Sequence, residues 1–180
     1  VGGNLTLTSG NASGIIDTMA SAGHKVTVGV NFSATTDANN GVINLGDLAV
    51  DGTIALTTHG TGEGAGDATV VNDVGLKFAA STIGDDLTAT ATDGDVTQEG
   101  ALTIVGETTI AVATGHDVTL DLASNDFNSD DANTNRQVTI TGRVVKISDT
   151  DTLFLGRQTI SGNLTVLAGG NIDDGDFLTV

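Results

Sequence analysis

The last third of the chain repeats with a period of twenty residues, and this period limits the possible folds more than any other feature. When residues 117–180 are written in rows of twenty, like residues fall into columns. The clearest columns contain Thr119, Thr139, Thr159 and Thr179; Leu120, Ile140, Ile160 and Val180; Phe127, Ile147 and Leu167; and Asp131, Asp151 and Asn171. A fixed period near twenty with strand-like content is typical of a solenoid, in which each repeat stacks on its neighbour.

Short runs of alternating apolar and polar residues extend this pattern toward the N-terminus. Their centres fall at positions 6, 27, 49, 69, 88, 103, 119, 139, 159 and 179. Alternation with a period of two predicts strands that are buried on one face. We therefore expect an all-β fold, a parallel β-helix (β-solenoid) of about nine coils of roughly 20 residues. Composition does not shift along the chain, so residues 1–180 are predicted to form a single β-solenoid domain.

Composition agrees with narrow, stacked layers. The chain has 38% hydrophobic residues but only 3% aromatic ones, so its core must consist mainly of aliphatic side chains. It contains 25 Gly and no Pro, which favours Gly at ordered turns over low-complexity sequence. The net charge of −17 argues against nucleic acid as a partner. No apolar run approaches the ~18 residues needed to span a bilayer.

Several longer phrases carry a family resemblance. They are GNLTLTSG, GDLAV, GDVTQEGALTIVG, TTIAVATGHDVTLDLASNDFN, LGRQTISGNLTVLAGGNI and GDFLTV. Together they resemble the repeats of filamentous-haemagglutinin-like exoproteins, which bacteria export by two-partner secretion. The resemblance implies a right-handed parallel β-helix, secretion to the cell surface, and an adhesive or structural role without catalytic residues. The Asn-Pro motifs of that family's secretion domain are absent from this Pro-free sequence, which leaves the export route open.

Acidic residues at the turns suggest a candidate metal site. Asp93 with Asp95, Asp149 with Asp151, and Asp174 with Asp176 each place two carboxylates on one turn. Like charges at neighbouring turns repel unless water or a cation screens them. The sequence predicts a candidate calcium site formed by Asp126, Asp130, Asp131 and Asp151. The simpler alternative is a set of solvated turns with no bound cation, and no other cofactor is expected.

Polysaccharide cleavage and ice binding are two further possible functions, and each has a simpler alternative. Asp149 and Asp151, with Arg143, Lys146 and Arg157 nearby in sequence, are the best candidates for a polysaccharide-cleaving site. Scattered solubilising charge explains these residues more simply, and His24, His59 and His116 form no recognisable triad, so we predict that the protein is not an enzyme. The threonine column could instead form an ice-like flat face, although threonine is common on any exposed sheet.

The sequence therefore predicts a structural or adhesive β-solenoid module of a bacterial extracellular or cell-surface fibre. The alternative is a carbohydrate-binding or carbohydrate-active β-helix. Joining the last residues, GDFLTV, to the first, VGGNLTLT, reproduces the internal pattern of the chain. We expect the sequence to be a segment of a longer repeat array or a filament subunit. Its expected partners are copies of itself or further repeats stacked end to end, with cell-surface glycans or other cells as additional partners.

Overall fold

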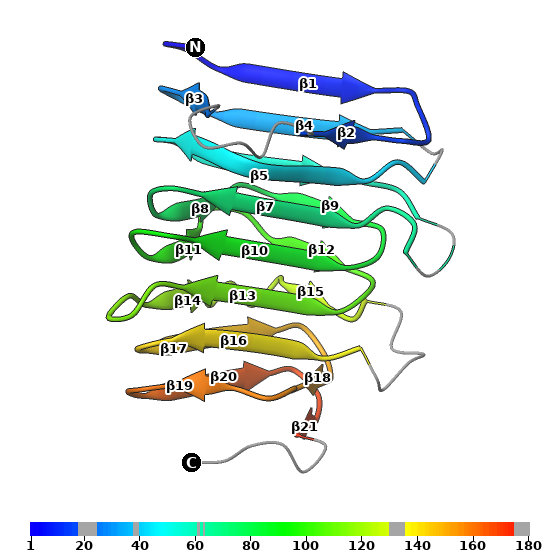
Figure 1. Cartoon of the computed structure of the whole chain (residues 1–180). Helices are drawn as coiled ribbons and strands as arrows, with labels where there is room; N and C mark the ends of the chain where they lie inside the picture. The colour runs from blue at the N-terminus through cyan, green and yellow to red at the C-terminus, as the bar shows by residue number, and fades with distance from the viewer. Residues whose placement is uncertain (18–24, 38–39, 61, 63, 130–135, 175–180) are drawn as a thin grey trace.

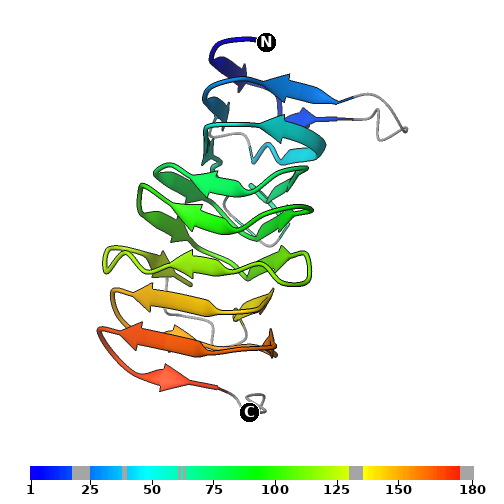
Figure 2. The same cartoon turned by 90° about the vertical axis from the view of Figure 1, so that its left-hand side faces the viewer.

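The protein is a stack of parallel strands, as expected. The computed structural model describes all residues except 18–24, 38–39, 61, 63, 130–135 and 175–180. In this part of the chain every strand pairs in parallel with a strand of a neighbouring turn, and there is no helix. The strands follow one another from the N-terminal to the C-terminal end in about 6 turns (Figure 1). The view from the side shows the same elongated stack (Figure 2). The prediction of an all-β solenoid is confirmed.

The largest sheet, here called sheet A, has 11 strands. It divides at β6, whose first residues pair with β8 and whose last residue, Thr57, pairs with Thr82 of β9. Its strands are β1 (Leu5–Ser9), β4 (Phe32–Thr36), β6 (Thr53–Thr57), β8 (Leu76–Phe78), β9 (Ser81–Ile83), β11 (Val96–Gln98), β12 (Leu102–Ile104), β14 (Val118–Leu120), β15 (Asp126–Phe127), β17 (Val145–Asp149) and β20 (Leu164–Ala168).

A second face of the solenoid is an 8-stranded sheet, here called sheet B. Its strands are β2 (Ile15–Ile16), β3 (Val26–Val28), β5 (Ile43–Val50), β7 (Ala68–Asn72), β10 (Leu87–Ala91), β13 (Thr108–Val112), β16 (Val138–Gly142) and β19 (Thr159–Ile160). A 2-stranded sheet of β18 (Leu153–Phe154) and β21 (Ile172–Asp173) forms a third face near the C-terminal end.

The core lies between the sheets and forms one cluster of buried side chains. Along β7 and β10 every second residue is buried, which is the burial pattern expected of strands with one face toward a core. Phe32 and Phe78 both pair with Ile54, so the two largest side chains of this region lie one above and one below it. Phe127 is fully buried, so its ring belongs to this core.

The twenty-residue columns are wrong as a description of which residues stack. Thr119 lies in sheet A opposite Lys146, whereas Thr139 lies in sheet B opposite Thr109. Thr159 pairs with Thr141 rather than with Thr139. Each turn contains strands of both sheets, so a twenty-residue step often passes from one face to another instead of returning to the same face.

The aliphatic columns fail for the same reason. Leu120 and Ile140 are buried, as predicted, but Leu120 pairs with Ile147 and Ile140 pairs with Ile110. Leu167, the expected partner of Ile147, is instead 61% exposed. The predicted column members Thr179 and Val180 lie outside the described residues.

The turns are fewer than the nine coils expected, and the strands show why. The alternating runs centred on Thr88 and Thr103 were assigned to separate coils, but they form β10 in sheet B and β12 in sheet A of one turn. The alternating pattern therefore located these strands correctly, but the two strands were counted as two coils although they are two faces of one turn.

Candidate functional site

The most unusual polar group of the described chain is Asp149, at the end of β17. Its side chain is buried, with 3% of the residue exposed. Oδ2 accepts a hydrogen bond from the backbone N–H of Phe127 at 2.8 Å, and Oδ1 accepts one from the N–H of Asp151 at 2.9 Å. Asp149 therefore connects its own turn to the β15 segment of the preceding turn.

The environment of Asp149 favours its protonated form. Burial is the main cause that raises the pKa of this carboxyl to about 7; the neighbouring Asp151 carboxyl acts in the same direction, and the two backbone N–H donors act in the opposite direction. Oδ1 of Asp151 is buried and accepts no hydrogen bond within the described residues. The sequence pattern Asp-x-Asp did not reveal the burial of Asp149 that raises its pKa.

Of the four predicted calcium ligands, Asp151 is the hydrogen-bonded neighbour of Asp149, and Asp126 lies on the adjacent turn. Asp126 lies in β15 between Asn125 and Phe127, and Asn125 O accepts the N–H of Thr150 at 2.8 Å, so Asp126 lies on the turn adjacent to Asp151. Asp130 and Asp131 lie outside the described residues. Across the described residues there is no group of three or more His, Cys, Asp or Glu that could hold a metal ion. The calcium site therefore stays a prediction.

Other turn carboxylates hold the backbone of the following turn. Asp95 Oδ1 accepts the N–H of Asp117 at 2.8 Å, and Asp117 Oδ1 accepts the N–H of Val144 at 3.0 Å. On another corner, Asp86 Oδ1 accepts the N–H of Glu107 at 2.7 Å. Acidic turns were expected either to bind a cation or to be solvated, but the oxygens of these acids cap backbone groups that the sheets leave unpaired. An acidic residue just before a strand in successive turns was the sequence signal for this role.

Two buried asparagines, Asn72 and Asn125, also form hydrogen bonds with the backbone of neighbouring turns. Asn125 is fully buried, and its side-chain amide bonds Leu102 N, Leu120 O and Ser148 O, groups that belong to three successive turns. Asn72 Oδ1 accepts the N–H of Val50 at 2.9 Å, and its Nδ2 donates to Gly75 O at 2.8 Å. The sequence analysis did not predict these internal hydrogen bonds.

Of the residues considered for catalysis, Asp149 and Asp151 are neighbours joined by a hydrogen bond, but no ion pair within the described residues joins either of them to the basic residues or the histidines. Arg143 binds Asp117 at 2.7 Å, at the opposite end of β17 from Asp149. Lys146 and Arg157 are exposed. His116 lies 3.4 Å from Asp95, and Nδ1 of His59 lies 3.0 Å from Thr36 O. His24 lies outside the described residues.

Threonine columns do exist on the outer faces, with a register different from the one predicted. On sheet B, successive strand partners are Thr69, Thr88, Thr109 and Thr139. On sheet A they are Thr8, Thr35, Thr57, Thr82 and Thr103. Neighbouring strands are ~4.8 Å apart, so each face presents regularly spaced hydroxyl and methyl groups.

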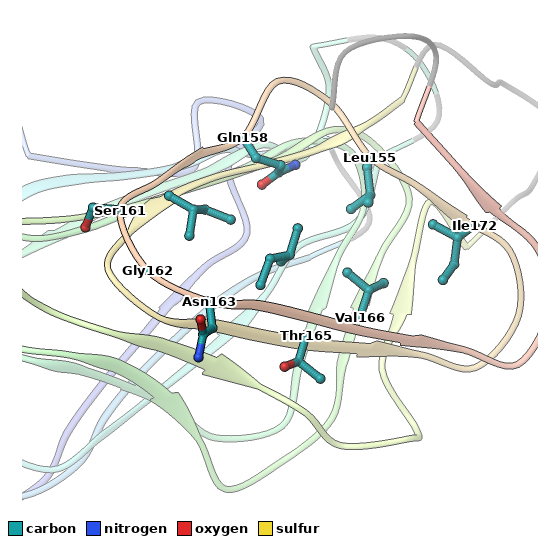
Figure 3. Close-up of a pocket in the computed structure, with 10 residues that line it drawn as sticks. Leu155, Gln158, Ser161, Gly162, Asn163, Thr165, Val166 and Ile172 are labelled. Carbon is teal, nitrogen blue, oxygen red and sulfur yellow. The ribbon is translucent and has the colours of Figure 1, made fainter. Parts of the chain in front are cut away.

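The C-terminal end of the described stack has an apolar groove. Side chains of Leu155, Val166 and Ile172 point into it, and Gln158 lines its edge (Figure 3). Ile160 and Leu164 also line it. The groove exposes the inside of the last turn, because no further described strand covers β19 or β20.

A protein-family model described as repeats of unknown function (DUF5649) matches residues 65–132 and 141–180, which is more than half of the sequence. The chain belongs to this family. The DUF5649 segments run from β7 to β15 and from the end of β16 through β21, so they cover strands of both main sheets. No curated protein and no solved structure matches the chain. Within its described residues, no helix is both long and apolar enough to cross a membrane.

Proposed function

We propose that this DUF5649 protein is a structural and adhesive module of a bacterial extracellular or cell-surface fibre, similar to the filamentous-haemagglutinin-like exoproteins. The observation that carries the proposal is the use of its polar residues. Backbone N–H groups of neighbouring turns donate hydrogen bonds to the side chains of Asp95, Asp117 and Asn125. Polar groups in this arrangement support a long stack of turns better than they support a reaction.

The repeat family and the parallel ladder support the same proposal. Repeats of one structural type contact mainly their neighbours, so such an array can be extended without redesigning its core. We take the solenoid to be right-handed, because parallel crossover connections have this hand in nearly all proteins. Export from the cell is part of the proposal and rests on the resemblance to secreted exoproteins.

Immunogold labelling of intact cells, followed by negative-stain electron microscopy of the released native protein, tests this function. We expect gold particles along thin surface fibres whose width matches one solenoid. Labelling confined to the cell interior, or release of compact particles alone, would contradict the proposal.

A carbohydrate-binding role is the second candidate, and the threonine columns favour it. Thr88 and Thr109 are exposed partners at the centre of sheet B, and repeating hydroxyl groups can follow the repeating hydroxyls of a polysaccharide. Co-sedimentation with insoluble polysaccharides tests this role. Thr88→Lys with Thr109→Lys should abolish binding, whereas the control Thr82→Lys on sheet A should not. Equal binding by the unmodified protein, the double variant and the Thr82 control would exclude sheet B as the polysaccharide-binding surface.

A further inference from the structure

The outer face of sheet B carries no charged side chain across four neighbouring strands. Strands β7, β10, β13 and β16 contain no Asp, Glu, Lys or Arg, although the whole chain has a net charge of −17. The acidic residues of this region lie in the turns instead, as Asp67, Asp86 and Glu107 do directly before their strands. A surface that excludes charge in so acidic a protein is suited to an uncharged partner.

This face presents two columns of outward residues in register, here called the threonine face. The first column is Thr69, Thr88, Thr109 and Thr139, and the second is Val71, Thr90, Ala111 and Thr141. Only Val71 and Ala111 depart from threonine, so β10 and β16 each present a complete Thr-x-Thr row. No register shift interrupts the pairing of these four strands, whereas β5 and β7 shift between Leu45 and Leu48.

The threonine face is regular and rigid. Neighbouring strands are about 4.8 Å apart, and alternate residues along one strand are about 6.6 Å apart. Behind the face, Leu87, Ile110 and Ile140 are buried in the core and hold the backbone in place. Threonine is branched at Cβ, so its side chain has few rotamers. The strands stack with little change of direction from one to the next (Figure 1), so the face is a flat grid of hydroxyl and methyl groups.

We propose that the threonine face of sheet B binds ice. On a prism face of hexagonal ice, water oxygens repeat along two perpendicular directions at distances close to the two spacings of this grid. Each threonine hydroxyl can donate a hydrogen bond to a lattice water and accept others. The methyl groups fill the spaces between these waters, so water ordered on the protein continues the lattice of the crystal. This activity goes beyond the fibre function and does not depend on it.

A flat, uncharged solid fits this face better than a sugar. Sites for small organic ligands are concave and have aromatic side chains with a few convergent polar groups. The four strands contain no aromatic residue, and hydroxyls are the only polar groups on their outward side chains. A polysaccharide chain follows one line of residues, whereas a crystal surface contacts both columns on all four strands at once.

Microscopy of single ice crystals in solutions of the purified protein tests the proposal. We expect faceted crystals and a freezing temperature below the melting temperature, with a gap that widens as the protein concentration rises. Thr88→Lys with Thr109→Lys should abolish both effects, because the lysine side chains stand above the plane of the grid. The matched control is Thr82→Lys with Thr103→Lys, which changes two paired threonines of sheet A, adds the same charge and should keep both effects.

A gain of activity tests the grid from the opposite direction. Ala111→Thr completes the Thr-x-Thr row of β13 without touching the core, so it should widen the gap between melting and freezing. Ala55→Thr is the matched control, because Ala55 faces outward on sheet A opposite Ser33, and it should leave the gap unchanged. Far-ultraviolet circular dichroism checks that each variant is folded, and Ala111→Thr decides if the lysine variant is not.

The outcomes separate ice binding from the other functions. Rounded crystals with no temperature gap, or equal losses in the two folded double variants, would overturn the proposal. Binding of an insoluble polysaccharide without any effect on ice would also overturn it and would leave the carbohydrate-binding role. The ice measurement uses neither cells nor fibres, so ice binding can fail while the fibre function stands, and the fibre function can fail while ice binding stands.

Discussion

Replacing Asn125 by alanine tests whether buried side-chain amides hold the turns together. The substitution removes the acceptor of Leu102 N–H, which is 3.0 Å from Oδ1, and the donor to Leu120 O, which is 3.0 Å from Nδ2. It also removes the bond to Ser148 O in the following turn. Gln98, which bonds both ends of the amide, is half-buried and can bind water instead.

The expected loss follows from the groups left behind. A buried backbone group without a partner costs roughly 1–3 kcal/mol. Leu102 N–H and Leu120 O are both left in a fully buried corner, so Asn125→Ala should lower the free energy of unfolding by about 2–5 kcal/mol. This is a large share of the stability of a typical domain.

Urea unfolding followed by far-ultraviolet circular dichroism measures this loss, because the chain lacks Trp and Tyr for fluorescence. Asn44→Ala is the matched control, since Asn44 lies on the exposed face of β5, and it should change the free energy by less than about 0.5 kcal/mol. If Asn125→Ala unfolds at the same urea concentration as the control, the buried amide does not stabilise the corner and the reasoning is wrong.

Three other variants or conditions test separate parts of the structure. Because the pKa of Asp149 is raised from 3.8 to about 7, its contribution to the free energy of unfolding should be greatest below pH 4 and disappear as pH rises through 7. Asp149→Asn should remove this pH-dependent contribution from urea unfolding curves, whereas the exposed control Asp121→Asn should not. Ile140→Asp, which buries a charge in sheet B, should unfold the neighbouring turns, and a normal melting temperature would contradict its burial. If the predicted calcium site exists, millimolar calcium should raise the melting temperature; no change with calcium or with chelator leaves the solvated-turn interpretation. The residues of that site are Asp126, Asp130, Asp131 and Asp151.

The sequence predicted strands well because alternation is a local signal. The runs 26–28, 102–104 and 118–120 coincide with β3, β12 and β14. The register in which neighbouring turns pair was not predictable in the same way, because it depends on the number of residues between the strands of each turn. Val118 pairs with Val145 while Leu87 pairs with Thr108, so no single repeat length describes the stack.

The polar residues at the turns could be predicted only in part from the sequence. Asp93 with Asp95 lies at a turn and Asp149 with Asp151 at the end of β17, while Asp176 of the third pair lies outside the described residues. Nothing in the Asp-x-Asp pattern distinguishes the buried carboxyl of Asp149 from the exposed one of Asp95. Burial depends on the position of the turn relative to its neighbours, and that position follows from the register. Asn125 was missed for the same reason, since a buried and an exposed turn asparagine are identical in sequence.

One crosslinking experiment tests the register of the solenoid most directly. Thr139 lies opposite Thr109 in sheet B, whereas the twenty-residue repeat places it opposite Thr119, which lies in sheet A. With a short bifunctional thiol reagent, Thr109→Cys with Thr139→Cys should form an intramolecular crosslink, and Thr119→Cys with Thr139→Cys should not. Crosslinking of the second pair without the first would show that the turns stack in the twenty-residue register, and it would contradict the two-sheet solenoid.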